Sequence, residues 1–313
     1  MYLTQSPGRG LKIIAGVVFW FSLGAPAYAD LTVIVNCATS NQDGLTGEAC
    51  TQVVKVNPGT LIPGETVSTG LSGSGPNSSF STSASARADY GSLGIAGAAS
   101  LVNAALPAGE NPNTRTGAVV SNSSTRWSDQ VTISGAPGSF VDVLVSFVVD
   151  IHAFDTSVSG EAQGSGLLTL NSTSQPGGIG WCFGFGRPDA CGAPGSFTAL
   201  TLGTNLITFT TQMAVGVSIP WAVDFVGSVG ARRLAGFDPT AGAASASYDA
   251  LNTAQSYFTV LTPGSTMNWA SGHDYSAPVV AIPEPETYLL LGMGLGMLGW
   301  MGRRRKVKVA AAA

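Results

Sequence analysis

The sequence predicts an all-β fold for residues 30–282, an antiparallel β-sandwich with jelly-roll-like topology. Long segments alternate apolar and polar residues, which is the pattern of strands with one buried face. Turn signals rich in Gly, Pro and Asn separate these segments. Outside the two ends of the chain, no segment shows a sustained apolar stripe with a 3.6-residue period. Many strands with such punctuation are typical of a sandwich.

Three segments carry the long alternations. Residues 80–90 alternate Phe, Thr, Ala and Tyr with Ser, Arg and Asp, and the phase slips past Gly91, which predicts a turn or bulge. Residues 140–154 place Val, Phe and Ile at every second position. Residues 207–225 do the same, with Val217 in the apolar set and Pro220 in the other. Since proline lacks the N–H that a ladder needs, Pro220 predicts an edge position, a bulge or a break.

Shorter strands are predicted where brief alternations lie between turn signals, at 31–35, 52–56, 130–134, 167–170, 198–202 and 257–261. The turn signals lie at 57–59, 136–138, 175–178 and 262–264. The Gly/Ser stretch 71–75 is interpreted as a flexible loop.

The charge balance argues against a nucleic-acid partner. The whole chain has a net charge of −4. Between residues 30 and 282 there are seven Lys and Arg against 16 Asp and Glu, so this region alone carries 7 − 16 = −9. Nucleic-acid binding requires a basic face that releases counterions. An acidic, Ser- and Thr-rich surface instead suits an extracellular protein.

The first 29 residues have the three parts of a secretory signal peptide. Arg9 and Lys12 come first, an 11-residue uncharged apolar run follows, and Ala27 and Ala29 supply the small residues of a cleavage site. The run is too short to span a bilayer, which takes about 20 residues. The sequence therefore predicts export through the Sec machinery and cleavage after Ala29.

The last residues, 283–313, have three different parts. Pro283, Glu284 and Pro285 precede 16 uncharged residues, and a basic cluster follows. A helix of that length reaches roughly 24 Å, and snorkelling basic side chains extend it, so we expect a single transmembrane helix with a cytoplasmic tail. The apolar residues that carry this expectation are Leu289, Leu290, Leu291, Gly292, Leu295, Leu298 and Trp300, and the basic tail is Arg303, Arg304, Arg305 and Lys306.

This tail resembles the PEP-CTERM sorting signal of Gram-negative bacteria that make exopolysaccharide. The resemblance implies recognition by an exosortase, a membrane enzyme thought to process such proteins at the cell envelope. It also implies an intermediate anchored in the inner membrane and a final place at the cell surface or in the extracellular matrix. The alternative is an ordinary single-pass anchor, in which Gly292 and Gly296 form a GxxxG packing face. Residues 84–91, 127–135 and 248–276 resemble the β-sandwich ectodomains often found before such tails.

Four cysteines form two local pairs. Cys37 and Cys50 are separated by 12 residues, and Cys182 and Cys191 by eight. An even number in an exported chain predicts disulfides, and these local pairings are the favoured ones of the three connectivities. Zinc is disfavoured, because the chain has no CxxC and only two histidines. No metal and no cofactor are predicted.

The candidates for catalysis are few. Asp150 and His152 point to the same side of the predicted strand 140–154, as a base with its orienting carboxylate or two metal ligands would. A solvated polar face explains the pair equally well and is favoured, since no nucleophile motif accompanies it. His273 and Asp274 lie in a Gly/Ser loop whose polarity explains them, and Asp142 lies about 27 Å along one strand from Asp150, too far for a carboxylate pair. No catalytic residue is predicted.

Tryptophans offer a binding alternative. Trp127, Trp181 and Trp269 stand near predicted loops or strand ends, where exposed rings stack on sugars. Burial in the core is the commoner fate of tryptophan in a sheet and is the favoured interpretation.

The leading hypothesis is a non-enzymatic protein of the cell envelope or extracellular matrix that associates with exopolysaccharide. Its expected partners are the Sec machinery, an exosortase and extracellular polysaccharide, with no nucleic acid. A carbohydrate-binding module and a secreted hydrolase are the alternatives.

Overall fold

A computed structural model gives the fold of one unit of the chain. The described residues are 29–39, 49–57, 59–75, 78–103, 117–158, 161–172, 175–186, 197–232 and 242–276. The chain divides into two units, Met1–Ser276 and Ala277–Ala313, and every described residue belongs to the first. Ala27, Cys191 and the whole predicted tail, 283–313, lie outside the described residues.

The first sheet has eight strands, in the order β10-β9-β8-β12-β6-β1-β2, with β14 also paired to β6. Nearly all of its pairs are antiparallel, and β10 with β9 is the parallel one. Its strands are β1 (Asp30–Thr39), β2 (Val53–Asn57), β6 (Ala118–Ser134), β8 (Glu161–Ser172), β9 (Gln175–Phe185), β10 (Thr198–Ala199), β12 (Ser218–Arg232) and β14 (Thr266–Trp269).

The second sheet has six strands, all antiparallel, in the order β11-β7-β13-β5-β4-β3. Its strands are β3 (Thr66–Ser74), β4 (Ser78–Asp89), β5 (Ser92–Asn103), β7 (Phe140–Val158), β11 (Gly203–Ala214) and β13 (Gly242–Val260).

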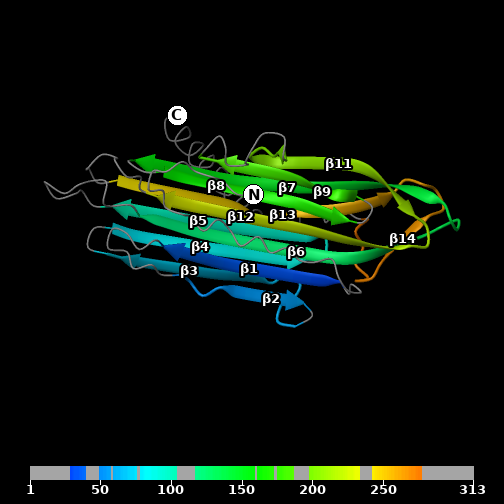
Figure 1. The fold of residues 1–313 in the computed structure, drawn as a ribbon, viewed down its shortest axis with the longest axis horizontal. Helices are drawn as coiled ribbons and strands as arrows, with labels where there is room; N and C mark the ends of the chain where they lie inside the picture. Colours follow the sequence, from blue (N-terminus) through cyan, green and yellow to red (C-terminus); the bar gives the residue numbers. More distant parts are fainter. Residues whose placement is uncertain are drawn as a thin grey trace, which may run out of the picture. The chain divides into compact units, whose positions relative to one another are not determined.

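The two sheets pack face to face, and the long strands of both run in nearly the same direction (Figure 1). Such aligned packing buries the inner face of each sheet and leaves the outer faces to solvent. The all-β, two-sheet prediction is therefore confirmed, while the finer jelly-roll-like topology stays a prediction.

The predicted long alternations lie on real strands. In β7 the buried residues are Val141, Val143, Val145, Phe147, Val149 and Ile151, as the sequence predicts. In β4 every second residue from Ser78 to Ala88 is buried. The chain then turns at Gly91, whose φ of 76° favours glycine, and continues into β5.

The third alternating segment, residues 207–225, contains a break between two strands. The chain turns at Gly216, between β11 and β12, so Val217 is 51% exposed and its predicted place in the core is wrong. Pro220 lies inside β12, where it pairs with Gln130 of β6. The pairing of β12 with β8 begins only at Trp221. Pro220 is therefore at a local edge, where the missing N–H is tolerated.

Three predictions of extent are corrected. The stretch 71–75, predicted as a loop, is mostly strand, because Thr66–Ser74 pairs with β4 along its whole length. The predicted strand 198–202 shrinks to the two residues of β10. The predicted strands 130–134 and 257–261 are the ends of the much longer β6 and β13.

The tryptophans belong to the core rather than to a binding platform. Trp127 is fully buried and Trp181 is 5% exposed, so the interpretation of these two rings as exposed sugar platforms is wrong. Trp269 is partly buried and packs on Phe258 and Tyr275, with ring centroids 4.8 and 4.3 Å apart. Inward-facing positions on paired strands keep Trp127 and Trp181 from solvent, and Trp269 keeps part of its surface exposed.

A disulfide joins Cys37 of β1 to Cys50, the pairing that the spacing predicts, and the backbone N–H of Cys50 donates to the carbonyl of Cys37. Cys182 is also disulfide-bonded, and its predicted partner Cys191 lies outside the described residues. Among the described residues, no helix has the length and apolar character needed to cross a membrane.

Candidate functional site

The outer face of the six-stranded sheet carries rows of small hydroxyl side chains. Its strands pair in register, so outward-facing residues at one level form a row across the sheet. Three successive rows are Ser72, Ser81, Ser100, Ser245 and Thr156, then Gly70, Ser83, Ala98, Ser247 and Phe154, then Ser68, Ser85, Ala96, Asp249 and His152. We call these three rows the hydroxyl face.

Hydrogen bonds join neighbouring hydroxyls within the rows. Ser68 Oγ lies 2.9 Å from Ser85 Oγ, and Thr156 Oγ1 lies 3.0 Å from Ser245 Oγ. Adjacent strands are about 4.8 Å apart, and successive rows about 6.7 Å apart along each strand. The face therefore presents hydroxyl donors and acceptors at spacings close to the size of a sugar ring, with gaps at Gly70, Ala96 and Ala98.

A groove of about 300 Å³ opens on this face. The outward side chains that line it are Ser83, Ser85, Ala96, Ala98, His152, Phe154, Ser247 and Asp249. Short side chains on β4, β5 and β13 make the groove shallow, while Phe154 and His152 of β7 form a taller wall. Within the described part of the chain, Phe154 is 62% exposed.

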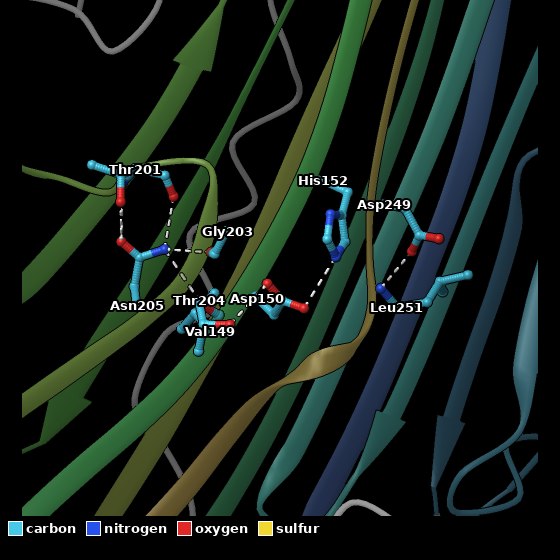
Figure 2. A network of polar contacts seen from close by, with 9 residues as sticks. All are labelled: Val149, Asp150, His152, Thr201, Gly203, Thr204, Asn205, Asp249 and Leu251. Atoms are coloured by element: carbon cyan, nitrogen blue, oxygen red, sulfur yellow. Dashed lines mark hydrogen bonds and ion pairs between the residues drawn. The ribbon is translucent and has the colours of Figure 1, made fainter. Parts of the chain in front are cut away.

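Asp150 and His152 meet at the end of this groove. Because both occupy outward positions of β7, two residues apart, His152 Nε2 lies 3.1 Å from Asp150 Oδ2. The other carboxylate oxygen, Asp150 Oδ1, accepts from Thr204 Oγ1 of β11 at 3.2 Å. Figure 2 shows Asp150 between Thr204 and His152. The side chain of His152 is 72% exposed and that of Asp150 is 31% exposed.

Asp249 lies directly across from His152 on β13 but is turned away. The two residues are cross-strand partners, and the register of β13 against β7 shifts just beyond them, between Asp249 and Gln255. Asp249 Oδ1 accepts from the backbone N–H of Leu251 at 3.0 Å (Figure 2). Across the described ranges, no group of three or more His, Cys, Asp or Glu side chains is placed to hold a metal ion.

The turn that delivers Thr204 is braced by Asn205. The side-chain amide of Asn205 donates to the carbonyls of Thr201 and Gly203 at 2.7 and 2.9 Å, and its Oδ1 accepts from the N–H of Thr201 at 2.9 Å (Figure 2). An Asn that bonds nearby backbone groups fixes a turn. These bonds hold the turn that places Thr204 beside Asp150.

A second polar cluster lies inside the sandwich, around Asp129 of β6. This residue is fully buried. Its carboxylate accepts from the backbone N–H of Ser271 at 3.1 Å, from the Ser271 hydroxyl, from Tyr275 Oη at 3.1 Å and from the N–H of Gln130 at 2.8 Å. Four donors satisfy the buried charge, so Asp129 fastens the segment after β14 to the sandwich.

Two tyrosines show the low polarity around this interior. Burial is the main cause that raises the pKa of Tyr275, and the nearby Asp129 charge adds to it. Burial also raises the pKa of Tyr248, whose Oη lies 2.5 Å from Ser123 Oγ. Both phenols stay neutral at physiological pH and serve as hydrogen-bonding groups of the core.

The remaining candidates from the sequence are not brought into the groove. Asp274 accepts from the N–H and Oγ of Ser276 at 2.8 and 2.6 Å, and these bonds lower its pKa. The His273 ring packs against Tyr275, with centroids 4.5 Å apart. Asp142, as expected, does not pair with Asp150; its Oδ1 accepts from Gln212 Nε2 at 3.2 Å.

The sequence pattern indicates Asp150 and His152 as candidates, but Asp129 and the hydroxyl face are not among its predictions. The signal for Asp129 is present, because a carboxylate shares the alternation phase of Trp127 and Val131. The signal for the hydroxyl face is the Ser at every second position of 79–85, which says nothing of the strands beside it.

An all-β sandwich with a hydroxyl-rich outer face is the class of protein that the fold and site define. Residues near the C-terminus indicate how the protein is sorted. Residues 281–306 match the family model of the PEP-CTERM protein-sorting motif, which confirms the resemblance noted from the tail. The chain thus carries the signal on which an exosortase acts, and proteins with this motif are exported and associated with the cell surface. No curated protein and no solved structure matches the chain.

Proposed function

We propose that the protein is a non-enzymatic component of the cell envelope or extracellular matrix whose hydroxyl face binds neutral exopolysaccharide. The observation that carries this proposal is the groove in which serine hydroxyls, an exposed phenylalanine ring and a His–Asp pair share one surface. The sorting signal supports this proposal, because proteins that carry it are exported and associated with the cell surface.

The chemistry of the groove suits a polyhydroxyl chain. Serine hydroxyls donate and accept, so they pair with sugar hydroxyls in either direction. An exposed ring such as Phe154 offers an apolar plane to the C–H side of a sugar. Because the groove is shallow and lies on a sheet face, a long polymer passes over it without needing a free end.

Charge favours a neutral polymer. Asp150 and Asp249 are the carboxylates beside the groove, and the predicted exported region carries a net charge of −9. A uronic-acid polymer would be repelled unless divalent cations intervened. The expected ligand is therefore a neutral glycan.

The proposal includes the export route that the sorting signal implies. The precursor passes the inner membrane through the Sec machinery, loses residues 1–29, is held by the tail helix, and is then handled by an exosortase. Deleting residues 283–313 and fractionating the cells tests this route. We expect the ectodomain to leave the envelope fraction, and an unchanged distribution would contradict the proposal.

Glycan binding is tested with Phe154→Ala and its matched control Phe140→Ala. Both phenylalanines are on β7 and similarly exposed, at 62% and 67%, but Phe140 lies about 46 Å further along the strand. In a pull-down with neutral matrix polysaccharide, Phe154→Ala should weaken retention at least threefold and Phe140→Ala should not. Equal retention of both variants would show that the groove is not the site.

A secreted hydrolase is the second candidate, and the 3.1 Å contact of His152 with Asp150 is the observation that favours it. The test is turnover of the same polysaccharide, measured as new reducing ends. If the protein releases reducing ends and His152→Ala abolishes the release, the pair is catalytic and the binding proposal fails. Retention without release supports the non-enzymatic proposal.

A further inference from the structure

The six-stranded sheet ends in two long strands, and within the described parts of the chain no further strand pairs with either of them. β3 and β11 are its terminal strands, with nine and 12 residues. β3 pairs only with β4 and β11 only with β7 among the parts of the chain that the structure describes. A terminal strand presents backbone N–H and C=O groups to any further strand.

Neither edge carries the usual protection against pairing. The sequences of β3 and β11 contain no charged residue and no proline. Natural proteins commonly blunt such edges with lysine, proline, bulges or a very short strand. As far as the described residues show, both edge strands are long, uncharged and suited to pairing with another strand.

The edge strands of the eight-stranded sheet can be compared with β3 and β11. Its terminal strand β2 has only five residues and carries Lys55, which pairs with Glu65. Its other terminal strand, β10, has only two residues. One sheet of the molecule thus has protected edges, and the other does not.

The two open edges are complementary in direction. All neighbours in the six-stranded sheet are antiparallel, so with six strands β3 and β11 run in opposite directions. A second copy that is translated along the sheet and rotated to follow the sheet's twist therefore brings its β3 antiparallel to β11 of the first. The contact between β3 of one copy and β11 of the other is then an antiparallel strand pair, like every other pair in the six-stranded sheet.

The side chains at the two edges also fit. The outward residues of β3 are the small Ser68, Gly70 and Ser72 of the hydroxyl face. Among the outward residues of β11, Leu206 is 71% exposed, and Thr208 is exposed as well. Small side chains on one strand leave room for larger ones on the other, and a Leu against them gains burial.

We propose that copies of this chain associate head to tail, with β11 of one copy pairing along β3 of the next. Because this contact uses two different surfaces, and repeated translation with rotation along the sheet axis continues as an open helix, it generates a filament. The six-stranded sheet then continues through the filament, and the hydroxyl faces of successive copies lie side by side. The proposal does not depend on polysaccharide binding.

The test uses lysines placed on each edge of the full-length protein in detergent. Leu206→Lys/Thr208→Lys blocks β11, and Ser72→Lys/Ser74→Lys blocks β3; all four residues are exposed, so the fold is expected to tolerate them. Val54→Lys/Val56→Lys on β2 is the matched control, with wild-type residues 50% and 38% exposed. Circular dichroism and thermal unfolding verify that each variant is folded.

Sedimentation velocity reads the outcome. We expect the wild type and the β2 control to form concentration-dependent chains longer than dimers, and each blocked variant alone to remain a monomer. An equimolar mixture of the two blocked variants should form dimers and nothing larger, since one native β3 and one native β11 remain. A monomeric wild type, or chains in either blocked variant, would overturn the proposal. Dimers of the β3-blocked variant alone would also overturn it, because they indicate symmetric β11–β11 pairing.

Discussion

Asp129 and Asp150 are carboxylates on consecutive strands, β6 and β7, and they differ in burial and in hydrogen-bond partners. Asp129 is fully buried, and four donors from its own strand and from residues 271 and 275 surround it. Asp150 is partly exposed on the outer face and pairs with His152, two residues away. One carboxylate holds distant parts of the chain together, and the other forms part of a surface.

The difference in burial determines whether each carboxylate can serve stability or binding. A buried charge that loses its donors is strongly destabilising, so Asp129 is fixed by the fold. An exposed hydrogen bond such as that between His152 and Asp150 contributes little to stability, because water solvates both partners almost as well. Asp150 and His152 are therefore free to serve binding.

The largest expected effect is that of Asp129→Ala. The substitution leaves the Tyr275 hydroxyl and the Ser271 N–H without their acceptor inside the sandwich, and should lower the free energy of unfolding by about 4 kcal/mol. Urea unfolding measures the loss. Asp129→Asn, which keeps one acceptor oxygen, should lose less, and a loss below about 1 kcal/mol for Asp129→Ala would show that the cluster does not hold segment 271–276.

Tyr275→Phe is expected to have the next largest effect. It removes one donor to Asp129 Oδ2 and keeps the ring contacts with Trp127, Phe258 and Trp269. A hydrogen bond to a charged group contributes about 2 kcal/mol, so urea unfolding should show a loss of that order. If the loss equalled that of Asp129→Ala, Tyr275 alone would account for the cluster.

Asp224 lies between the two extremes, and its effect should depend on pH. Burial raises the pKa of this carboxyl, and Arg126, whose Nη1 lies 3.7 Å from Asp224 Oδ1, opposes the shift. The folded state then binds the proton more tightly than the unfolded state, so this group's contribution to stability grows as the pH falls through the raised pKa and is lost as the pH rises. Asp224→Asn should flatten the pH dependence of unfolding on the alkaline side of pH 3.8, the ordinary pKa of an aspartate, by less than the Tyr275 effect; an unchanged slope would contradict this.

Much of the fold follows from the sequence because β-strand periodicity is local. The alternation of 140–154 defines which face of β7 is buried, and Gly91 marks the β4–β5 turn correctly. The sequence-based predictions are wrong where pairing between strands, rather than the local pattern, determines the structure. Residues 71–75 have the composition of a loop but pair with β4, and Val217 continues an alternation that a turn at Gly216 interrupts.

The site was harder to predict than the fold, since its residues come together only across strands. Asp150 and His152 were found because they share one strand. The hydroxyl face needs the order of β3, β4, β5, β13 and β7, which joins segments more than 150 residues apart. Asp129 likewise meets Ser271 only through tertiary packing.

The smallest effect on stability is expected for Asp150→Asn and His152→Ala. Both side chains face solvent, so each substitution should change the free energy of unfolding by less than about 0.5 kcal/mol. If the hydroxyl face binds neutral glycan, the same variants should nevertheless weaken polysaccharide retention, because the His152 ring lines the groove and Asp150 holds it by a 3.1 Å contact. A variant that lost stability and retention together would place the pair with Asp129, as structure rather than surface.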